Sequence, residues 1–273
     1  MSDGYVLGHS ERELARLADQ ARLIGPITRR IFERAGIGRG MRVLDVGSGV
    51  GDVAFLVADL VGREGEVVGY DRVPRALEVA RRRAAERGTS NVFFREGDPS
   101  QAEAGAPFDA VVGRYVLMFQ PDPAATLRGV ARHARPGGIV AFHEIDWDGA
   151  RSSPPAPTFD AACRWIAEVV ARSGASTRMG MHLHATFLAA GLPAPAMHLE
   201  AQIEGAVASL ELVRLTSDLV ISLLPEMERF GVVTAAEVSP ETLEGRMIAE
   251  IVAGRGAVTG RSEIGAWART ASS

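Results

Sequence analysis

Residues 43–52, Val-Leu-Asp-Val-Gly-Ser-Gly-Val-Gly-Asp, place three glycines and two acids at the end of a short apolar run. An apolar run, closely spaced glycines and then a helical pattern are typical of the turn where an α/β sheet binds a nucleoside cofactor. The glycine spacing is G-x-G-x-G, whereas a dinucleotide fingerprint is G-x-G-x-x-G. Asp52 follows the last glycine directly, and its carboxylate would repel a pyrophosphate. The pattern therefore favours a cofactor without phosphate, and Asp52 can also serve as the N-cap of the next helix.

Two further acids follow the next two strand-like segments. Asp71 ends the segment 67–71, about 20 residues after the glycines, where a carboxylate can accept hydrogen bonds from both ribose hydroxyls. Asp98 follows Glu96 and Gly97, where it can accept a hydrogen bond from the exocyclic amine of adenine. The alternatives are a solvated residue after a strand for Asp71 and an ordinary turn residue for Asp98. With the glycines, these acids indicate a nucleoside site.

Strand-like and helical segments alternate through the first half of the chain. Short Val-rich runs between amphipathic helices predict βαβ units and a parallel sheet that is covered on both faces. An earlier helical pattern covers His9–Ala35, where Ser10 and Glu13 form a capping-box pattern and Pro26 is expected to divide the helix into two. The remaining strands are expected at 42–46, 66–70, 91–95, 109–112 and 139–143, and the remaining helices at 52–61, 74–87 and 123–134.

The pattern changes after Trp147. Residues 151–157 are a Ser/Pro-rich connection that suits neither a helix nor a central strand. Further helices are expected at 158–173, 183–190, 206–230 and 242–253, and strands at 196–203 and 261–269; Pro225 is expected to break the third of these helices. We therefore expect an N-terminal helical segment at 1–40. It is followed by one domain at 41–273 with helical cap insertions at about 151–190 and 206–256, which makes one structural domain overall.

Composition narrows the range of partners and compartments. The chain has 273 residues, of which 47% are hydrophobic, and a formal net charge of −4, so it reads as a soluble globular protein with no basic groove for nucleic acid. Every basic residue is an arginine, which excludes lysine chemistry. The lone cysteine, Cys163, excludes an intramolecular disulfide, and no segment resembles a signal peptide or a membrane span. We expect a cytoplasmic protein with no nucleic-acid and no membrane partner.

Five features in this order resemble the class I S-adenosylmethionine-dependent methyltransferases: residues 43–52, Asp71, and residues 96–98, 108–115 and 135–138, the last read as a turn into the fifth strand. The resemblance covers roughly Met41–Glu144. Residues 5–10 and the following helix are similar to the small-molecule branch, the ubiquinone/menaquinone-type and natural-product methyltransferases. The resemblance implies a Rossmann-like, doubly wound, mostly parallel seven-stranded sheet with an antiparallel last strand, N-terminal helices and a helical cap.

The resemblance also implies S-adenosylmethionine as the cofactor. The glycine loop would approach its methionine part beside Arg114, Arg72 would flank the adenine, and Asp45 would act through other residues of the site. In such families the N-terminal segment commonly folds over the cofactor. The sequence departs from the common Cys-Gly pair by having Ser48. The residues expected to bind the cofactor are Tyr5, Gly47, Ser48, Gly49, Asp71, Arg72, Gly97, Asp98, Pro99 and Arg114.

Methyl transfer from a sulfonium is an in-line displacement, in which positioning supplies most of the acceleration. A general base is needed only if the acceptor must lose a proton. His143, where the fifth strand meets the cleft, and His9, at the first helix, are the expected catalytic residues. Backbone bonding at the strand end is the alternative for His143, and a helix-start role is the alternative for His9. His182 and His184 are two residues apart and point to poorly matched sides, so no metal site is expected.

The remaining question is the acceptor. Residues 113–116 lack the Asn/Asp-Pro-Pro-aromatic motif of nucleic-acid amino-methyltransferases, and a nicotinamide oxidoreductase would need the missing third glycine. We predict methyl transfer to a small-molecule acceptor, with O-methylation in secondary or quinone metabolism as the first interpretation. N- or C-methylation of a natural product, or cofactor-assisted cyclisation without methyl transfer, are the alternatives. A homodimer is compatible with the sequence. The apolar helical residues Met179, Met181, Leu223, Leu224 and Met227 could line the acceptor pocket or belong to the core.

Overall fold

The computed structural model describes residues 11–101, 105, 107–205 and 210–272, with side chains described from residue 22 onward. The chain forms two compact units. We call the first the sheet unit; it comprises Ile24–Glu144, Met179–Leu199 and Ile264–Ser273. The second, which we call the helical unit, comprises the described residues of the ranges Met1–Leu23, Ile145–Arg178 and Glu200–Glu263. One structural domain overall stays a prediction.

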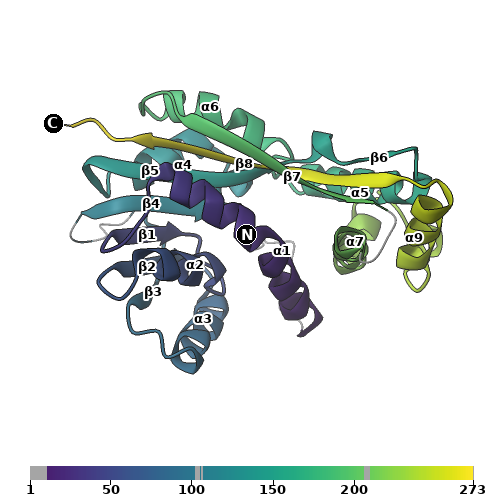
Figure 1. The fold of residues 1–273 in the computed structure, drawn as a ribbon, viewed down its shortest axis with the longest axis horizontal. Helices are drawn as coiled ribbons and strands as arrows, with labels where there is room; N and C mark the ends of the chain where they lie inside the picture. Colours follow the sequence, from purple (N-terminus) through teal and green to yellow (C-terminus); the bar gives the residue numbers. More distant parts are fainter. Residues whose placement is uncertain (1–10, 102–104, 106, 206–209, 273) are drawn as a thin grey trace. The chain divides into compact units, whose positions relative to one another are not determined.

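Strands and helices alternate through most of the first half of the chain, and helices are more numerous in the second half (Figure 1). The first half of the chain contains α1 (Glu11–Ala35), β1 (Arg42–Val46), α2 (Asp52–Val61), β2 (Glu66–Asp71), α3 (Pro74–Glu86), β3 (Val92–Glu96), β4 (Phe108–Arg114), the short helix η1 (Leu117–Phe119), α4 (Pro123–Ala131) and β5 (Ala134–Asp146). The second half contains η2 (Trp147–Gly149), β6 (Arg151–Ser153), α5 (Pro157–Arg172), α6 (Met179–Ala189), β7 (Ala196–Gly205), α7 (Glu211–Arg229), α8 (Ala235–Val238), α9 (Leu243–Ala253) and β8 (Ala257–Arg269).

The strands run in the order β3-β2-β1-β4-β5-β8-β6, and β7 pairs with β8. Strands β1 to β5 pair in parallel, and β6 pairs with β8 antiparallel. These pairings confirm the predicted doubly wound, mostly parallel α/β sheet. The described part of the chain has eight strands rather than seven, because residues 151–153 of the expected Ser/Pro-rich connection form β6 at the end of the strand order. The direction of winding reverses between β1 and β4, and at such a switch point the carboxyl ends of the strands leave a crevice for a ligand.

The core of the sheet unit depends on alternation along its central strands. Val43 of β1, Ala110 and Val112 of β4, and Ala141 of β5 belong to one buried cluster that also contains apolar residues of α1, α2 and α3. The residues between them, such as Leu44 and Val111, are also fully buried but lie outside that cluster. Because successive strand side chains point to opposite faces, both faces of these strands are covered, as an apolar run in a parallel sheet requires.

The two helix breaks expected at prolines are wrong. Pro26 lies inside α1 and Pro225 lies inside α7. A proline within a helix removes one backbone hydrogen bond and costs about 3 kcal/mol, but it does not forbid the helix. On the carboxyl side of Pro26, three large side chains are fully or almost fully buried, and each contributes about 1.5–3 kcal/mol, which offsets that cost. These side chains are Ile27, Ile31 and Phe32.

Residues 135–138, expected as a turn, instead form a bulge inside β5. Phe108 pairs with Ala134 and Ala110 pairs with Ile139, so residues 135–138 all lie opposite the single residue Asp109. A bulge of this kind bends its strand and lets the ladder continue on both sides. The Pro-Gly-Gly sequence marks a real irregularity, but the β4–β5 pairing resumes on both sides of it.

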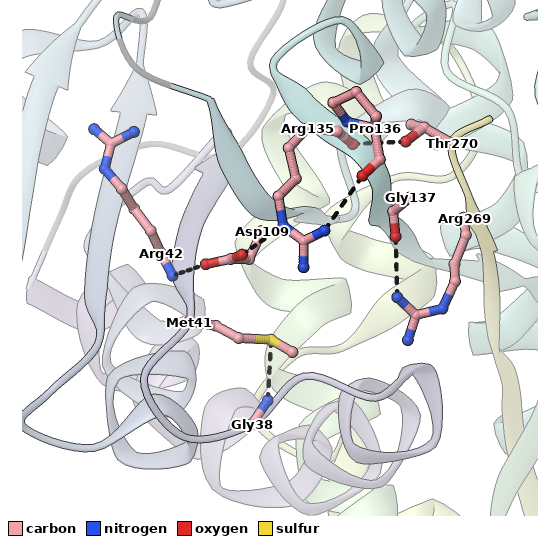
Figure 2. A network of polar contacts seen from close by, with 9 residues as sticks. All are labelled: Gly38, Met41, Arg42, Asp109, Arg135, Pro136, Gly137, Arg269 and Thr270. Carbon is pink, nitrogen blue, oxygen red and sulfur yellow. Dashed lines mark hydrogen bonds and ion pairs between the residues drawn. The ribbon is translucent and has the colours of Figure 1, made fainter. Parts of the chain in front are cut away.

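Asp109 holds this bulge to the amino end of β1 (Figure 2). Its Oδ2 accepts a hydrogen bond of 2.8 Å from the backbone N of Arg42, and its Oδ1 accepts one of 2.7 Å from Nε of Arg135. Arg269 Nη1 donates to the Gly137 carbonyl at 3.0 Å on the other side of the bulge. Burial acts to raise the pKa of Asp109, but the Arg42 and Arg135 interactions outweigh it and lower the pKa from its usual value of 3.8.

The helical unit packs α5 against α7 and α9. Thr158 donates its hydroxyl proton to Oε1 of Glu250 at 2.6 Å, which ties the start of α5 to α9. Leu223 and Met227, considered above as pocket residues, are buried in α7. Burial raises the pKa of the Cys163 thiol to about 12, so this thiol stays protonated and unreactive at neutral pH. Among the described residues, no helix is both long and apolar enough to cross a bilayer.

We expect Asp109→Asn to lower the free energy of unfolding by about 1 kcal/mol at neutral pH, because it replaces charge-assisted hydrogen bonds with neutral ones. Since folding lowers the pKa of Asp109, its stabilisation is present above pH 3.8 and is lost as the pH falls through the folded-state pKa. Urea unfolding at pH 7 and below pH 4 measures both effects. Asp59→Asn, at an exposed ion pair with Arg29, is the control and should change little. An equal loss of stability at both pH values would contradict the assignment.

Candidate cofactor site

The glycine loop joins β1 to α2 at the carboxyl edge of the sheet. Ser48 N donates to the Tyr70 carbonyl at 2.9 Å, which ties the loop to β2. Gly47 has φ +68°, and a Cβ added there would lie 2.8 Å from Cγ2 of Val116. Gly49 also has a positive φ, but a Cβ at Gly49 would meet no heavy atom within 4 Å. The loop is thus packed tightly at Gly47 and open at Gly49, where a ligand can approach the backbone.

Asp52 is the first residue of α2 rather than its N-cap, so the N-cap interpretation is wrong. The N-cap is Gly51, whose φ of +93° is left-handed. The carboxylate of Asp52 pairs with Nη2 of Arg83 at 2.7 Å, and Nη1 of the same arginine donates to the Val50 carbonyl at 2.6 Å. An acid in the first helical turn is favoured by the helix dipole, and here it also fastens the loop to α3.

Asp71 ends β2 next to the glycine loop. Its Oδ2 accepts a hydrogen bond from Gly49 N and its Oδ1 accepts one from Val73 N, each at 2.8 Å. Gly97 N donates to the Asp71 backbone carbonyl at 2.9 Å, so the end of β3 lies beside the end of β2. A carboxylate has about four acceptor positions, so two remain for ribose hydroxyls. The ribose role of Asp71 stays a prediction.

Asp98 and Arg72 form an ion pair at this edge. Asp98 Oδ1 also accepts a 2.8 Å hydrogen bond from Ser100 N. Partial burial acts to raise the pKa of Asp98, but hydrogen bonds from Ser100 and Arg72 outweigh it and lower the pKa from 3.8. His133 Nε2 donates to the Pro99 carbonyl at 2.7 Å, which fixes the loop after β3. The residues expected around adenine, Arg72 after β2 and Gly97–Pro99 after β3, are thus joined by the Arg72–Asp98 ion pair.

Asp45 is a buried acid at the carboxyl end of β1. It is 1% exposed, and neither of its carboxylate oxygens has a hydrogen-bond partner among the described residues. Burial raises the pKa of Asp45 well above 3.8. The charge of Arg114 opposes this rise, the charges of Asp71 and Asp52 add to it, and the backbone N–H of Ala54 also lowers the pKa. A buried carboxylate without a partner is costly unless a cation lies beside it.

His143 is fully buried and lies opposite Arg114 in the β4–β5 register. Its Nδ1 is 3.2 Å from Oγ1 of Thr28 on α1, and its carbonyl accepts a hydrogen bond of 2.9 Å from Tyr115 N. The rings of Tyr115 and His143 have centroids 5.4 Å apart. Glu144, also fully buried, accepts hydrogen bonds at Oε1 from the backbone N of Val116 (2.9 Å) and of Leu117 (2.7 Å). Glu144 thus shapes the turn after β4.

Thr28 contacts His143 and Arg114, two residues of the candidate site, and the sequence analysis did not single it out. Its signal was a polar residue next to Ile27 and one turn before Ile31, on the apolar side of a helical pattern.

His182 and His184 lie exposed on α6, and the described residues contain no group of three His, Cys, Asp or Glu that could hold a metal. Tyr5 and His9 lie outside the described residues.

The fold and the site define a class of protein: a doubly wound α/β protein with a nucleoside-cofactor site at the switch point of its sheet. The family described as "Methyltransferase domain" matches residues 37–180, just over half of the chain. The chain therefore belongs to the methyltransferase domain family.

Relatives of known name match over about two fifths of the chain. Aklanonic acid methyltransferase DauC of Streptomyces sp. (strain C5) is 37% identical over 118 residues, 43% of this chain and 54% of that protein. Ubiquinone biosynthesis O-methyltransferase of Paracidovorax citrulli (strain AAC00-1) is 39% identical over 111 residues, 40% and 45% of the two chains. The chain thus spans about half the length of these relatives. The solved [4+2]-cyclase SpnF, 21% identical, has a TM-score of 0.51 and covers 91% of this chain and 81% of that one, which is a likeness of fold alone.

The residues present fit S-adenosylmethionine. Its methionine ammonium and its sulfonium are cations of the kind that the unpartnered Asp45 carboxylate calls for. The open sides of Gly49 and Gly97 leave room beside the backbone, and Asp71 retains acceptor capacity for a ribose. A cation held in this site would add to the opposing charge that Arg114 already gives to Asp45.

We expect Asp45→Asn to stabilise the ligand-free protein by about 1 kcal/mol or more at neutral pH, because it removes an unpartnered buried charge. Folding raises the pKa of Asp45, so the cost of the native carboxylate is absent below pH 3.8 and grows as the pH rises through the folded-state pKa. Denaturant unfolding across this range measures the difference, with Asp59→Asn as the exposed control. A variant less stable than the wild type at pH 7 would contradict this account of Asp45.

Proposed function

We propose that this protein transfers a methyl group from S-adenosylmethionine to a small-molecule acceptor. The observation that carries the proposal is the convergence of the glycine loop, Asp71 and Asp98 at one sheet edge, in a chain of the methyltransferase domain family. The bound cofactor supplies an electrophilic methyl group on a sulfonium. The protein's task is to hold donor and acceptor at near-attack distance.

The residues of the sheet unit divide this task. Asp71 accepts from the ribose, and Asp98 with Arg72 meets the adenine edge. Arg114 lies at the methionine end, and the carboxylate of Asp45 offsets the positive charge of the bound methionine part. Gly47 and Gly49 let the loop backbone approach the ligand, while Arg83 fastens the loop through Val50 and Asp52.

We infer O-methylation as the specific reaction. An acceptor hydroxyl must lose a proton during transfer, and we assign this proton to His143, which lies opposite Arg114 in the β4–β5 register. The names of two relatives, one acting in ubiquinone biosynthesis as an O-methyltransferase and one acting on aklanonic acid, support a small quinone-like or polyketide acceptor. N- and C-methylation would use the same cofactor site. The atom that carries the methyl group in the product distinguishes them from O-methylation.

We expect calorimetry to detect binding of S-adenosylmethionine and S-adenosylhomocysteine to the wild-type protein. Asp71→Ala should weaken binding by about 1–3 kcal/mol, roughly 5- to 150-fold, because charged hydrogen bonds to the ligand and to Gly49 N are both lost. Asp59→Ala, on the exposed side of α2, is the matched control and should bind as the wild type does. Absence of binding by the wild-type protein would overturn the cofactor assignment, and unchanged affinity of Asp71→Ala would overturn the ribose role.

We expect His143→Gln to lower kcat by about 10²–10⁴-fold while changing the affinity for S-adenosylhomocysteine less than twofold, because a general base acts on the acceptor. The assay follows labelled methyl from S-adenosylmethionine into a panel of phenols, catechols and hydroquinones. His184→Gln, exposed on α6, is the control. Unchanged kcat in His143→Gln would remove the base from the mechanism. Bound cofactor with no label in any product would favour cofactor-assisted chemistry without methyl transfer.

A further inference from the structure

One buried hydroxyl group joins three parts of the sheet unit. Thr28 of α1 is fully buried, and its Oγ1 lies 3.2 Å from the Ile24 carbonyl, 3.2 Å from Nη1 of Arg114 and 3.2 Å from Nδ1 of His143. The oxygen therefore has three polar neighbours from α1, β4 and β5. A threonine hydroxyl can donate one proton and accept two, so these three contacts use its whole capacity.

The chemistry of two of these neighbours determines the role of the third. The Ile24 carbonyl can only accept a hydrogen bond, and the Arg114 guanidinium can only donate one. The hydroxyl of Thr28 therefore donates its proton to the Ile24 carbonyl, and one lone pair of Oγ1 accepts a hydrogen bond from Arg114. The second lone pair faces His143 and requires a proton on Nδ1. If the hydroxyl pointed to His143 instead, two oxygens would face each other at 3.2 Å with no proton between them.

We propose that Thr28 is a positioning residue that holds neutral His143 as its Nδ1–H tautomer, with the lone pair on Nε2. The inference rests on the proposed function, in which His143 is the base. The nitrogen that takes a proton from an acceptor must carry the lone pair, and the hydrogen bond at the other nitrogen decides which one does. In many histidine-dependent sites a carboxylate or a backbone carbonyl has this role; here it falls to a hydroxyl.

The packing around Thr28 restricts its side chain to one conformation. Ile24, Ile27 and Ile31 surround Thr28 on α1 and are almost fully buried, so the side chain has little room to change rotamer. The same oxygen accepts from Arg114, the residue expected at the methionine end of the cofactor. Oγ1 of Thr28 thus contacts both the imidazole of His143 and the guanidinium of Arg114, and it holds the two side chains at a fixed distance from each other.

The direct test is the tautomer of His143 in the full-length protein, read from two-bond proton–nitrogen correlations after labelling the histidine nitrogens. His143→Gln identifies its signals. We expect the pattern of an Nδ1–H imidazole in the wild type and in Thr28→Ser. Thr28→Val, which is close to isosteric, should lose that preference. A proton on Nε2 in the wild type, or the wild-type tautomer in Thr28→Val, would overturn the proposal. The wild-type spectrum decides even if Thr28→Val does not fold.

Kinetics separate this proposal from the function on which it rests. We expect Thr28→Val to lower kcat about 10- to 100-fold, as with other groups that orient a histidine, and Thr28→Ser to restore most of it. Thr216→Val is the control, because Thr216 is also buried and bonds back to its own helix, at the Leu212 carbonyl (2.8 Å). If the wild type shows the Nδ1–H tautomer but transfers no methyl group, the proposed function fails and the role of Thr28 in setting the tautomer stands. If methyl transfer occurs and Thr28→Val matches the wild type in kcat, the positioning role fails.

Discussion

The carboxylate of Asp45 lies buried at the carboxyl end of β1, where neither oxygen has a hydrogen-bond partner among the described residues. Two further acids, Asp52 and Asp71, add their negative charge, and Arg114 is the cation that opposes it. Burying a charge this way is unfavourable unless something positive completes the site. The acids around Asp45 thus outnumber Arg114, and a site with this balance of charge suits a cationic methyl donor better than an anionic dinucleotide.

Arg114 extends this constraint from the cofactor site to the predicted base. It lies opposite His143 in the β4–β5 register, and it donates to the hydroxyl of Thr28, which also lies beside His143. Helix α1 thus contributes more than apolar cover, since one of its buried residues contacts both strands. Glu144 and Tyr115 complete the arrangement by fixing the turn after β4. A movement of the Arg114 guanidinium would therefore alter the hydrogen bond between Thr28 and the His143 imidazole.

Where sequence reasoning failed, packing overrode a local preference. Pro26 was expected to end a helix, but the side chains after it gain more from burial than the lost backbone bond costs. Residues 135–138 were expected as a turn, yet Asp109 and Arg269 hold them as a bulge within β5. Asp52 was considered as a helix cap, but the left-handed Gly51 takes that position. Of these three cases, the bulge is the one decided by residues distant in sequence, since Asp109 and Arg269 are 26 and 132 residues from their partners.

The sequence by itself determined the order of strands and helices through Asp146 and the edge at which Gly47, Asp71 and Asp98 would gather, because hydrophobic periodicity and glycine spacing are local properties of the chain. Only the tertiary structure decided that Asp45 has no partner and that Thr28 lies against His143. Burial and hydrogen-bond partnership depend on atoms that can be far apart along the chain, as with Thr28 and His143, whose positions differ by 115. Hydrophobic periodicity in the sequence does not predict which buried hydroxyl contacts which imidazole.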